Sequence, residues 1–593
     1  MSPTVRSRTR SPTLAAALSH GQLRLAWKNT VRHGLRRQGL ADLHDYLDVH
    51  RRLPLIVTRI HNEVVAGTYR PREPEFVSVE KKLGITRRVV IPSPEDAIIL
   101  QALVDGIEKP ILEQQPSPDA FYSRSHAPPT VYDIDSSFPY PWWELWPEFQ
   151  ARIWAFAREC PFVAVTDLAN YFDSIPLKTL RNRLVSIAHL REELVDFLFF
   201  LLEQMGWRPD YVPNSGVGLP QIQFDAPRLL AHAYLFEADD FLQHHSLSSM
   251  VRWMDDINIG VSSIEDGKKV LRDLDEMLAA MGLRLNTGKS QILSGREMLS
   301  AMWVAENRRL NGIDKILDTN PAKARSRSIA AFGPVWRGTR QGAWGKIVRR
   351  YFTVFTRLKD PFLERYVPSV LADLPGVRDK VIRYYTVLGY SARRFRQIED
   401  YLKSGACIDE WSLYSCLQLL VSWAIPLRSP YQRRALSLSL EVHATRRENH
   451  VATAGVIGVW AKYATPRALH RLILSTSRTW RRSDWAARQV AAVTPVLGVW
   501  GAAIYEMIAG YGLRDGMEVL FSLRQIRRLE ALDNQLKSYL FQPRGDYPYP
   551  FAKILTSIAL LNGRLADPDR TRLLEYLRTE TGDPSFVRLV SVF

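Results

Sequence analysis

The sequence predicts an α/β domain in the first half of the chain and an all-α domain in the second half. Two segments carry the β signal. Residues 162–167 form a short β-branched, apolar run that ends in an acid, and residues 251–261 alternate apolar and polar side chains around a short polar centre. These patterns are typical of a buried strand and of a tight hairpin with one buried face. From about residue 320 the sequence shows successive amphipathic helices with sparse β signals.

Three aspartates stand at the ends of the predicted strands. Asp255 and Asp256 occupy the hairpin tip, and Asp167 ends the earlier strand. Adjacent carboxylates repel each other unless a cation lies beside them, and their oxygens suit a divalent metal. An acid on one strand that faces an acid pair on a neighbouring strand is the arrangement that two-metal phosphoryl transfer needs. Taken alone, the pair is also compatible with an exposed acidic turn, and the chain carries another such pair, Asp239 and Asp240, in a predicted amphipathic helix.

Six blocks between about residues 80 and 300 resemble, in order and spacing, the motifs of reverse transcriptases. They are a fingers block at 81–103, an aromatic-Arg block at 120–124, motif A at 165–176, motif B at 218–221, motif C at 253–256 and motif D at 282–289. Trp253 replaces the tyrosine that motif C usually carries. The resemblance implies a right-hand polymerase with fingers and palm that uses dNTP substrates. Its two Mg²⁺ ions would be held by the catalytic acids Asp167, Asp255 and Asp256.

The resemblance implies roles for further residues. Phe172 stands where the family places a steric gate against the ribose 2′-hydroxyl, and Gln221 where motif B touches the nucleotide or template. Lys289 is a candidate acid for the pyrophosphate leaving group, with a plain surface lysine as the alternative. Basic fingers residues would grip the incoming triphosphate through charge-assisted contacts, with a solvated basic loop as the alternative. These fingers residues are Lys82, Arg87 and Arg88.

Motif B departs from the family pattern. The usual Pro-Gln-Gly followed by a serine is replaced by the run Pro-Gln-Ile-Gln-Phe-Asp-Ala-Pro over residues 220–227. Loss of the glycine removes a position at which backbone could approach a nucleotide closely. The departure therefore argues against ordinary templated copying, but not against phosphoryl transfer itself.

Composition and charge are consistent with this interpretation. The 593 residues carry a formal net charge of +17, which suits a polyanionic partner. The 3 cysteines show no metal-ligand or disulfide spacing, which predicts a reducing interior. No apolar run is expected to span a membrane. The nearest, residues 490–504, is short and contains Pro495, so a buried helix is the better interpretation.

The chain is expected to have three parts. Residues 1–41 contain no acid and several arginines, which predicts a basic arm that binds nucleic acid, with a transit peptide as the alternative. Residues 42–310 would form the reverse transcriptase fingers and palm. They include a Pro- and aromatic-rich loop between 124 and 162 that packs on the palm, with stacking on bases as the alternative. Residues 320–593 would form the all-helical domain, in which loose helical pairs of the HEAT type are compatible with the pattern.

The helical half indicates the subtype. It has no His/Cys cluster of the kind found in group II intron endonuclease modules, and the chain is longer than retron enzymes. A palm fused to a long helical region instead resembles the abortive-infection and defence-associated reverse transcriptases of bacteria. That resemblance implies a cytoplasmic enzyme in antiphage defence, with RNA or DNA product as partner. It leaves open a noncoding RNA, a partner protein and a homo-oligomer.

Some members of that group make DNA without a conventional template, primed from a protein hydroxyl that is commonly a tyrosine. Tyr547 and Tyr549, in a Pro- and Gly-containing loop, are candidates. Two alternatives stand beside this interpretation. One is a mobile-element or maturase-type enzyme bound to its intron RNA, and the other is a non-catalytic scaffold that binds nucleic acid.

Overall fold

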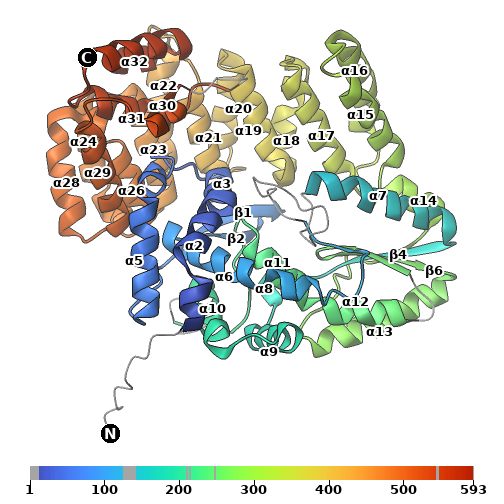
Figure 1. Cartoon of the computed structure of the whole chain (residues 1–593). Coiled ribbons are helices and arrows are strands. Elements are labelled where there is room, and N and C mark those ends of the chain that lie inside the picture. Colours follow the sequence, from blue (N-terminus) through green and yellow to red (C-terminus); the bar gives the residue numbers. More distant parts are fainter. Residues whose placement is uncertain are drawn as a thin grey trace. The chain divides into compact units, whose positions relative to one another are not determined.

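The structure, a computed structural model, describes residues 12–123, 142–208, 211–212, 216–245, 249–541 and 547–591 (Figure 1). The chain divides into two compact units, and neither unit is continuous in sequence. The first comprises residues 1–37, 52–76 and 88–305, and the second comprises residues 38–51, 77–87 and 306–593.

A five-stranded sheet forms the centre of the first unit. In sheet order its strands are β3 (Ala120–Phe121), β5 (Ser249–Trp253), β6 (Asp256–Val261), β4 (Phe162–Asp167) and β7 (Gln291–Ser294). β3 runs parallel to β5, and the other neighbours are antiparallel. The predicted hairpin is β5–β6 and the predicted buried strand is β4, so the two β segments expected from the sequence are confirmed.

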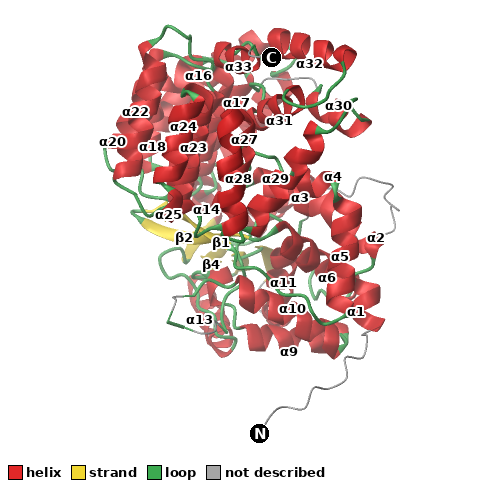
Figure 2. Cartoon of the chain, turned by 90° about the vertical axis from the view of Figure 1, so that its left-hand side faces the viewer, coloured by secondary structure: helices red, strands yellow, loops and turns green. Residues whose placement is uncertain are grey.

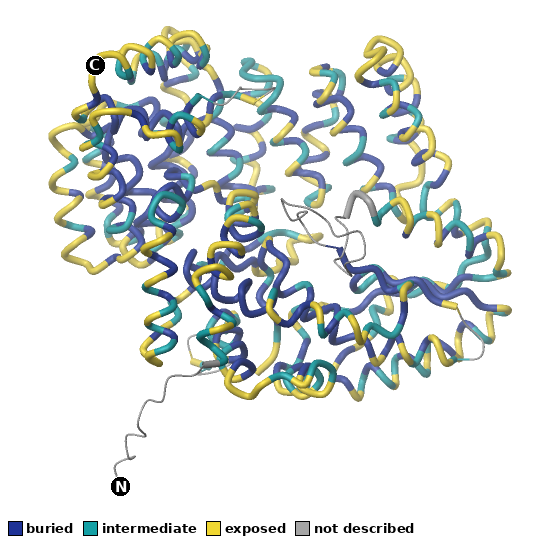
Figure 3. The backbone as a smooth tube through the Cα atoms, in the orientation of Figure 1, coloured by how far each residue is buried: buried dark blue, intermediate teal, exposed yellow. Residues whose placement is uncertain are grey.

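Helices cover both faces of this sheet. On one face, α7 (Trp142–Glu159) and α14 (Gly295–Ala301) contribute side chains to a core with β3, β4 and β5. On the other face lie α12 (Phe236–His244) and α13 (Ile264–Ala280) (Figure 1). The sequence predicted a hairpin with one buried face. Because helices pack on both sides, the five residues of β6 after Asp256 are all buried instead (Figure 3).

Helix α7 lies within the segment that was expected to be a loop. Residues 142–159 are helical, and Phe149 and Ile153 are buried in the core of the palm. Pro147 stands inside this helix. Because proline is uncommon in helix interiors, its presence led to the prediction of a loop, which is wrong for these residues. The expected packing on the palm is therefore made by a helix. Tyr140 and Arg124 lie outside the described residues.

The described part of residues 1–41 also differs from a basic arm. It forms helices whose apolar residues Leu23, Trp27, Val31 and Leu35 are fully buried. Apolar side chains at helical spacing therefore place this segment in the core of the first unit, although its composition is basic. The other helical elements of the first unit are α1 (Pro12–Ala17), α2 (His20–Ala26), η1 (Trp27–Val31), α3 (Arg32–Arg37), α5 (Leu53–Val65), α6 (Pro94–Leu112), α8 (Tyr171–Ser174), α9 (Leu177–Ala188), α10 (Glu192–Met205) and α11 (Ala226–Tyr234).

A separate two-stranded sheet follows α5. Its strands are β1 (Glu75–Lys82) and β2 (Ile85–Ile91). Leu83 and Gly84 connect them with φ angles of 52° and 82°, which closes a two-residue turn in the left-handed region. The turn residues group with the second unit and the C-terminal end of β2 groups with the first.

The second unit is helical over the ranges that the structure describes, apart from the β1–β2 tip (Figure 2). Its helices as far as residue 444 are α4 (Leu47–Arg51), α15 (Val304–Ile316), α16 (Pro321–Arg337), α17 (Trp344–Arg357), η2 (Pro361–Tyr366), α18 (Val367–Asp373), η3 (Pro375–Val377), α19 (Arg378–Leu388), α20 (Ala392–Lys403), α21 (Glu410–Ser422) and α22 (Pro430–Ala444). The others are α23 (His450–Tyr463), α24 (Pro466–Ser475), α25 (Ser477–Trp480), α26 (Asp484–Ala492), α27 (Thr494–Leu497), η4 (Gly498–Trp500), α28 (Gly501–Gly510), α29 (Arg514–Arg527), α30 (Asn534–Leu540), α31 (Phe551–Leu561), α32 (Asp567–Glu580) and α33 (Pro584–Val590).

A buried ion network joins residues 38–51 to the helices of the second unit. The guanidinium of Arg488, on α26, donates from Nε to Asp42 at 2.9 Å and from Nη1 and Nη2 to Asp48 at 2.8 and 2.9 Å. All three side chains are at most 2% exposed. Charges removed from water are stable only when paired and hydrogen-bonded, so this network fixes residues 42–48 onto α26.

Among the helices described, none is by itself long and apolar enough to cross a membrane. Residues Asp484–Ala492 and Thr494–Gly510 meet the length and composition criteria only as a pair, with a bend of 46° between them.

Arg488→Met should lower the free energy of unfolding by about 3–5 kcal/mol, because it leaves two buried carboxylates without a counter-charge. Denaturant unfolding followed by circular dichroism measures the change. The matched control is Arg357→Met, whose partner Asp318 is 81% exposed, and it should cost less than about 1 kcal/mol. Equal effects of the two variants would contradict a structural role for the buried network.

Candidate active site

Pairing between β4 and β6 brings the three predicted catalytic acids together. Asp167 lies directly opposite Asp256 in the antiparallel register, at the ends of the two central strands. Asp255 stands in the turn between β5 and β6, one residue before Asp256. Asp167 is buried, whereas Asp255 and Asp256 are half-buried. The sheet register therefore places three carboxylates at one end of the sheet.

The three acids repel one another. Burial, followed by the charges of Asp167 and Asp256, raises the pKa of Asp255 to about 7 from an ordinary value of 3.8. A rise of this size means that the cluster does not readily hold three negative charges without a cation.

Lys289 supplies a positive charge to this cluster. Its ammonium donates to Oδ2 of Asp167. Burial lowers the pKa of Lys289, but the carboxylates of Asp167, Asp256 and Asp255 outweigh that effect and the pKa is raised overall. The backbone fixes the same contact, because Asn286 N donates to Asp167 O at 2.7 Å and Lys289 N donates to Asn286 O at 2.9 Å. The motif D lysine is thus brought to the site that the sequence predicted.

The donor set fits divalent metal ions. Carboxylate oxygens are hard ligands of the kind that Mg²⁺ and similar ions prefer. Oδ1 of Asp167 is buried and accepts no hydrogen bond from any described residue, so it is an acceptor that a cation would satisfy. As the side chains lie, no group of three or more His, Cys, Asp or Glu among the described residues is arranged to hold a metal. Metal binding by these acids therefore stays a prediction.

Hydrogen bonds join the predicted gate residue to the motif B loop. Leu219 N donates to the carbonyl of Phe172 at 2.7 Å, and Gly218 N donates to Ile175 O at 2.8 Å. Gly218 has φ +101°, which a residue with a side chain rarely adopts. The half-buried Phe172 therefore has its backbone fixed against the motif B loop.

Gln221 is held by a residue that the sequence did not single out. Its Nε2 donates to Oδ1 of Asp173 at 2.8 Å, and its carbonyl accepts from Val90 N, on β2, at 3.0 Å. Asp173 directly follows Phe172 in motif A, and its position beside the gate is the signal that could have found it. The motif B glutamine is thus tied to motif A on one side and to β2 on the other.

The predicted basic fingers residues lie on β1 and β2. Lys82 and Arg87 lie near the β1–β2 tip, which groups with the second unit. Arg88 belongs to the first unit, and its guanidinium lies over the ring of Trp207, 5.2 Å from the centroid. Their contact with a triphosphate stays a prediction.

The ring of Trp253, in motif C, is packed among other aromatic side chains. Its ring stacks on Phe121 at a centroid distance of 6.2 Å and meets Trp146 edge-on at 5.1 Å and Phe149 at 5.3 Å. Two of these partners come from α7, where the sequence predicted a loop. The larger indole therefore fills the contact between β5 and α7.

Residues 144–321 match the family model described as reverse transcriptase (RNA-dependent DNA polymerase). This segment is a reverse transcriptase domain. Such a domain is an RNA-directed DNA polymerase, a nucleotidyltransferase, and the domain here contains the three aspartates, Phe172, Gln221 and Lys289.

The other comparisons add a structural similarity only. Apo telomerase from Candida tropicalis is similar over 78% of this chain and 73% of that chain, with 10% sequence identity and a TM-score of 0.28. No curated protein sequence matches the chain.

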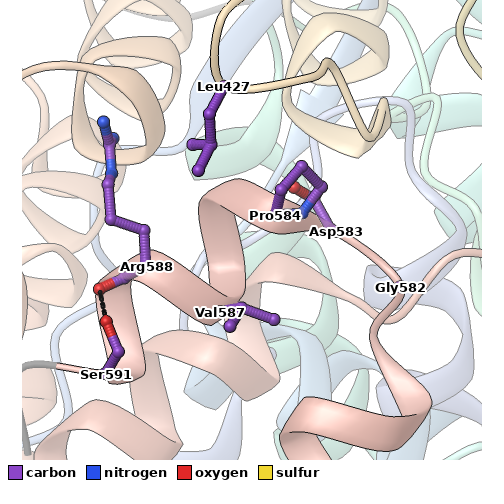
Figure 4. Close-up of a pocket in the computed structure, with 7 residues that line it drawn as sticks. All are labelled: Leu427, Gly582, Asp583, Pro584, Val587, Arg588 and Ser591. Carbon is purple, nitrogen blue, oxygen red and sulfur yellow. Dashed lines mark hydrogen bonds between the residues drawn. The ribbon is translucent and has the colours of Figure 1, made fainter.

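A cavity of about 490 Å³ lies within the second unit (Figure 4). Arg588 is its one basic lining residue, and its Nη2 donates to Lys462 O at 3.2 Å, within the protein. The cavity contains none of the predicted site residues. It is lined by Leu427, Gly582, Asp583, Pro584, Val587, Arg588 and Ser591.

Asp255→Asn should raise the free energy of unfolding of the metal-free protein at pH 8 by about 1–3 kcal/mol, because it removes one of three repelling charges. A tenfold change in a protonation equilibrium corresponds to about 1.4 kcal/mol, and solvent screens part of the repulsion. The folded pKa of about 7 exceeds the ordinary 3.8, so wild-type stability should fall as pH rises between these values and the full cost is present at pH 8.

Thermal unfolding at pH 5 and pH 8 measures this difference. The control is Asp240→Asn, an exposed carboxylate outside the cluster, which should change stability by less than about 0.5 kcal/mol. Added Mg²⁺ should stabilise the wild type and narrow the gap to Asp255→Asn. A variant that is less stable than wild type at pH 8 would show that the acids do not repel one another in the folded protein.

Proposed function

We propose that the protein is a reverse transcriptase-like DNA polymerase that adds dNTPs by two-metal phosphoryl transfer and acts in bacterial antiphage defence. The observation that carries the polymerase chemistry is the meeting of Asp167, Asp255 and Asp256 at one end of the sheet. A scaffold that only binds nucleic acid has no electrostatic reason to hold three mutually repelling carboxylates together.

The three aspartates would hold two Mg²⁺ ions, which supply activation of the 3′-hydroxyl and neutralisation of the triphosphate. Lys289 carries a proton at neutral pH, as lysines ordinarily do, and the carboxylates around it raise its pKa further. Its ammonium would donate that proton to the departing pyrophosphate. Its contact with Asp167 keeps that ammonium at the acids before substrate binds.

Phe172 and Gln221 would select and orient the nucleotide. The backbone of Phe172 is fixed by Leu219, so its ring can exclude a 2′-hydroxyl by shape. Gln221 is oriented by Asp173 in a loop that lacks the family's glycine. The fingers cations Lys82, Arg87 and Arg88 would join them when a triphosphate is bound.

The finer proposal is synthesis without a conventional template, primed from a protein hydroxyl. The altered motif B supports it, because the backbone cannot approach a nucleotide there as closely as glycine permits. Tyr549 does not suit priming: it is 3% exposed, and its hydroxyl donates to Leu540 O at 3.0 Å. Tyr547 is 38% exposed and remains the candidate of the two.

The proposed defence role rests on the long helical half that follows the palm, and the net charge of +17 suits a polyanionic partner. We propose that its helices pair in HEAT-like fashion, contact the nucleic-acid product and support a homo-oligomer in the bacterial cytoplasm. A noncoding RNA or a partner protein would act on the same surface. A maturase-type enzyme would instead require its own intron RNA for activity.

Purified protein with Mg²⁺ and labelled dNTPs, without added template or primer, should form labelled product that resists phenol extraction and disappears on DNase treatment. The variant Asp255→Asn, Asp256→Asn should lower incorporation at least about 10³-fold, because it removes two of the three metal ligands. The matched control is Asp240→Asn, which changes an aspartate that also follows another aspartate but lies outside the site. It should retain activity.

The outcomes separate the proposals. Incorporation only after an RNA template and primer are added would establish conventional reverse transcription and overturn the untemplated proposal. Activity that survives loss of both aspartates would overturn the two-metal assignment. Wild-type protein that binds nucleic acid but incorporates no label under either condition, or with host RNA added, would favour the scaffold.

Phe172→Ala should increase ribonucleotide incorporation relative to deoxynucleotide incorporation by about 10-fold or more, because a smaller side chain admits the 2′-hydroxyl, and steric discrimination of this kind is worth about 1–3 kcal/mol. Competition between one labelled dNTP and its rNTP measures the ratio. Phe200→Ala, an exposed phenylalanine on α10 in the same unit, is the control. An unchanged ratio of ribonucleotide to deoxynucleotide incorporation for Phe172→Ala would show that Phe172 is not a steric gate.

A further inference from the structure

A buried arginine lies beneath the turn that carries two of the catalytic acids. Arg252, on β5, has a fully buried side chain, and so does its partner Asp239 on α12. Its Nε donates to Asp239 Oδ1 at 2.6 Å, and its Nη2 donates to Asp239 Oδ2. This is the two-point geometry that only a guanidinium can make with a carboxylate.

The remaining arm of the same guanidinium reaches the catalytic turn. Nη1 of Arg252 donates to the carbonyl of Met254 at 2.9 Å. Met254 has φ +54°, in the left-handed region that a residue with a side chain adopts at a cost. A backbone in that conformation persists only where its surroundings determine it, and the hydrogen bond from Arg252 is such a determinant.

The two faces of β5 hold the turn in different ways. Trp253 packs into the aromatic core with α7 and fixes the strand by shape. Arg252 points to the opposite face, toward α12, because successive side chains on a strand alternate. Its bond to the Met254 carbonyl acts on the peptide immediately before Asp255. The direction in which that peptide points sets the direction of the Asp255 side chain.

A purely structural ion pair would not need this third contact. Asp239 already accepts hydrogen bonds from Nε and Nη2. Such a pair could join α12 to the sheet at a position remote from the turn. Instead, the pair is placed so that the remaining nitrogen of the arginine, Nη1, binds the one left-handed residue of the β5–β6 turn. The acid pair Asp239–Asp240, which the sequence indicated only as part of an amphipathic helix, therefore contains one residue that acts on the site.

We infer that Arg252, oriented by Asp239, is a positioning residue that fixes the Met254 peptide and so presents Asp255 and Asp256 in the geometry for catalysis. The inference rests on the proposed polymerase function for its kinetic consequence. The consequence for the backbone of the turn does not depend on that function.

The test uses a double variant that removes the clamp without leaving a buried charge. Arg252→Met with Asp239→Leu replaces the ion pair by apolar side chains, a change that folded proteins often tolerate. The full-length double variant should keep the melting temperature within a few degrees of wild type. Hydrogen exchange at the amides of 254–256 should be at least 10-fold faster. The kcat for dNTP incorporation should fall at least 10-fold while the KM for dNTP stays within 3-fold.

A third substitution separates positioning from packing. Glycine adopts positive φ without strain, so adding Met254→Gly to the double variant should recover at least 3-fold in kcat. Arg252→Lys keeps the charge but offers a single donor nitrogen. It should also lower kcat, by a smaller factor than the double variant does. Arg272→Met, which breaks an exposed ion pair on α13, is the matched control and should change neither exchange nor kcat.

Wild-type exchange at 254–256 in a stable double variant would overturn the inference, whatever the activity. Faster exchange with an unchanged kcat would show a structural clamp without a positioning role and would equally overturn it. If the wild type incorporates no dNTP, the proposed function fails, and the exchange measurement alone then decides whether Arg252 fixes the turn.

Discussion

Mutual repulsion of three carboxylates is the constraint on which the rest of this structure depends. Asp167, Asp255 and Asp256 are held at one end of the sheet by the register of β4 against β6, and burial adds to the cost of charging them together. Lys289 offsets part of that cost through its contact with Asp167. A fold keeps such an arrangement where a cation and a phosphate substrate make use of it, which is the physical basis of the polymerase proposal.

The palm holds this cluster from several directions. The turn between β5 and β6 is fixed by aromatic packing of Trp253 on one face and by the Arg252–Asp239 pair on the other. Motif A and motif B are tied together by backbone hydrogen bonds and by the contact of Gln221 with Asp173. These contacts fix the backbone and side chains beside the acids, so the arrangement of the cluster depends on neighbours as well as on the acids themselves.

The second unit depends on a different kind of contact. Residues 38–51 lie more than 400 positions from α26 in sequence, and yet Asp42 and Asp48 share the guanidinium of Arg488. A boundary drawn at residue 41 from composition could not anticipate this, because composition records charge and not partners. The basic segment before it likewise forms buried helices, since its apolar residues recur at helical spacing.

The sequence by itself determined the two central β segments and the helical character of the described second half, and it predicted the three acids. Those signals are local, because strand alternation and motif spacing depend on near neighbours. Only the tertiary structure decided that residues 142–159 form a helix over the sheet, that Asp239 pairs with Arg252 beneath the β5–β6 turn and that Asp173 holds Gln221. These depend on contacts between residues far apart in the chain, and a hydrogen bond between distant side chains leaves no periodic trace in the sequence.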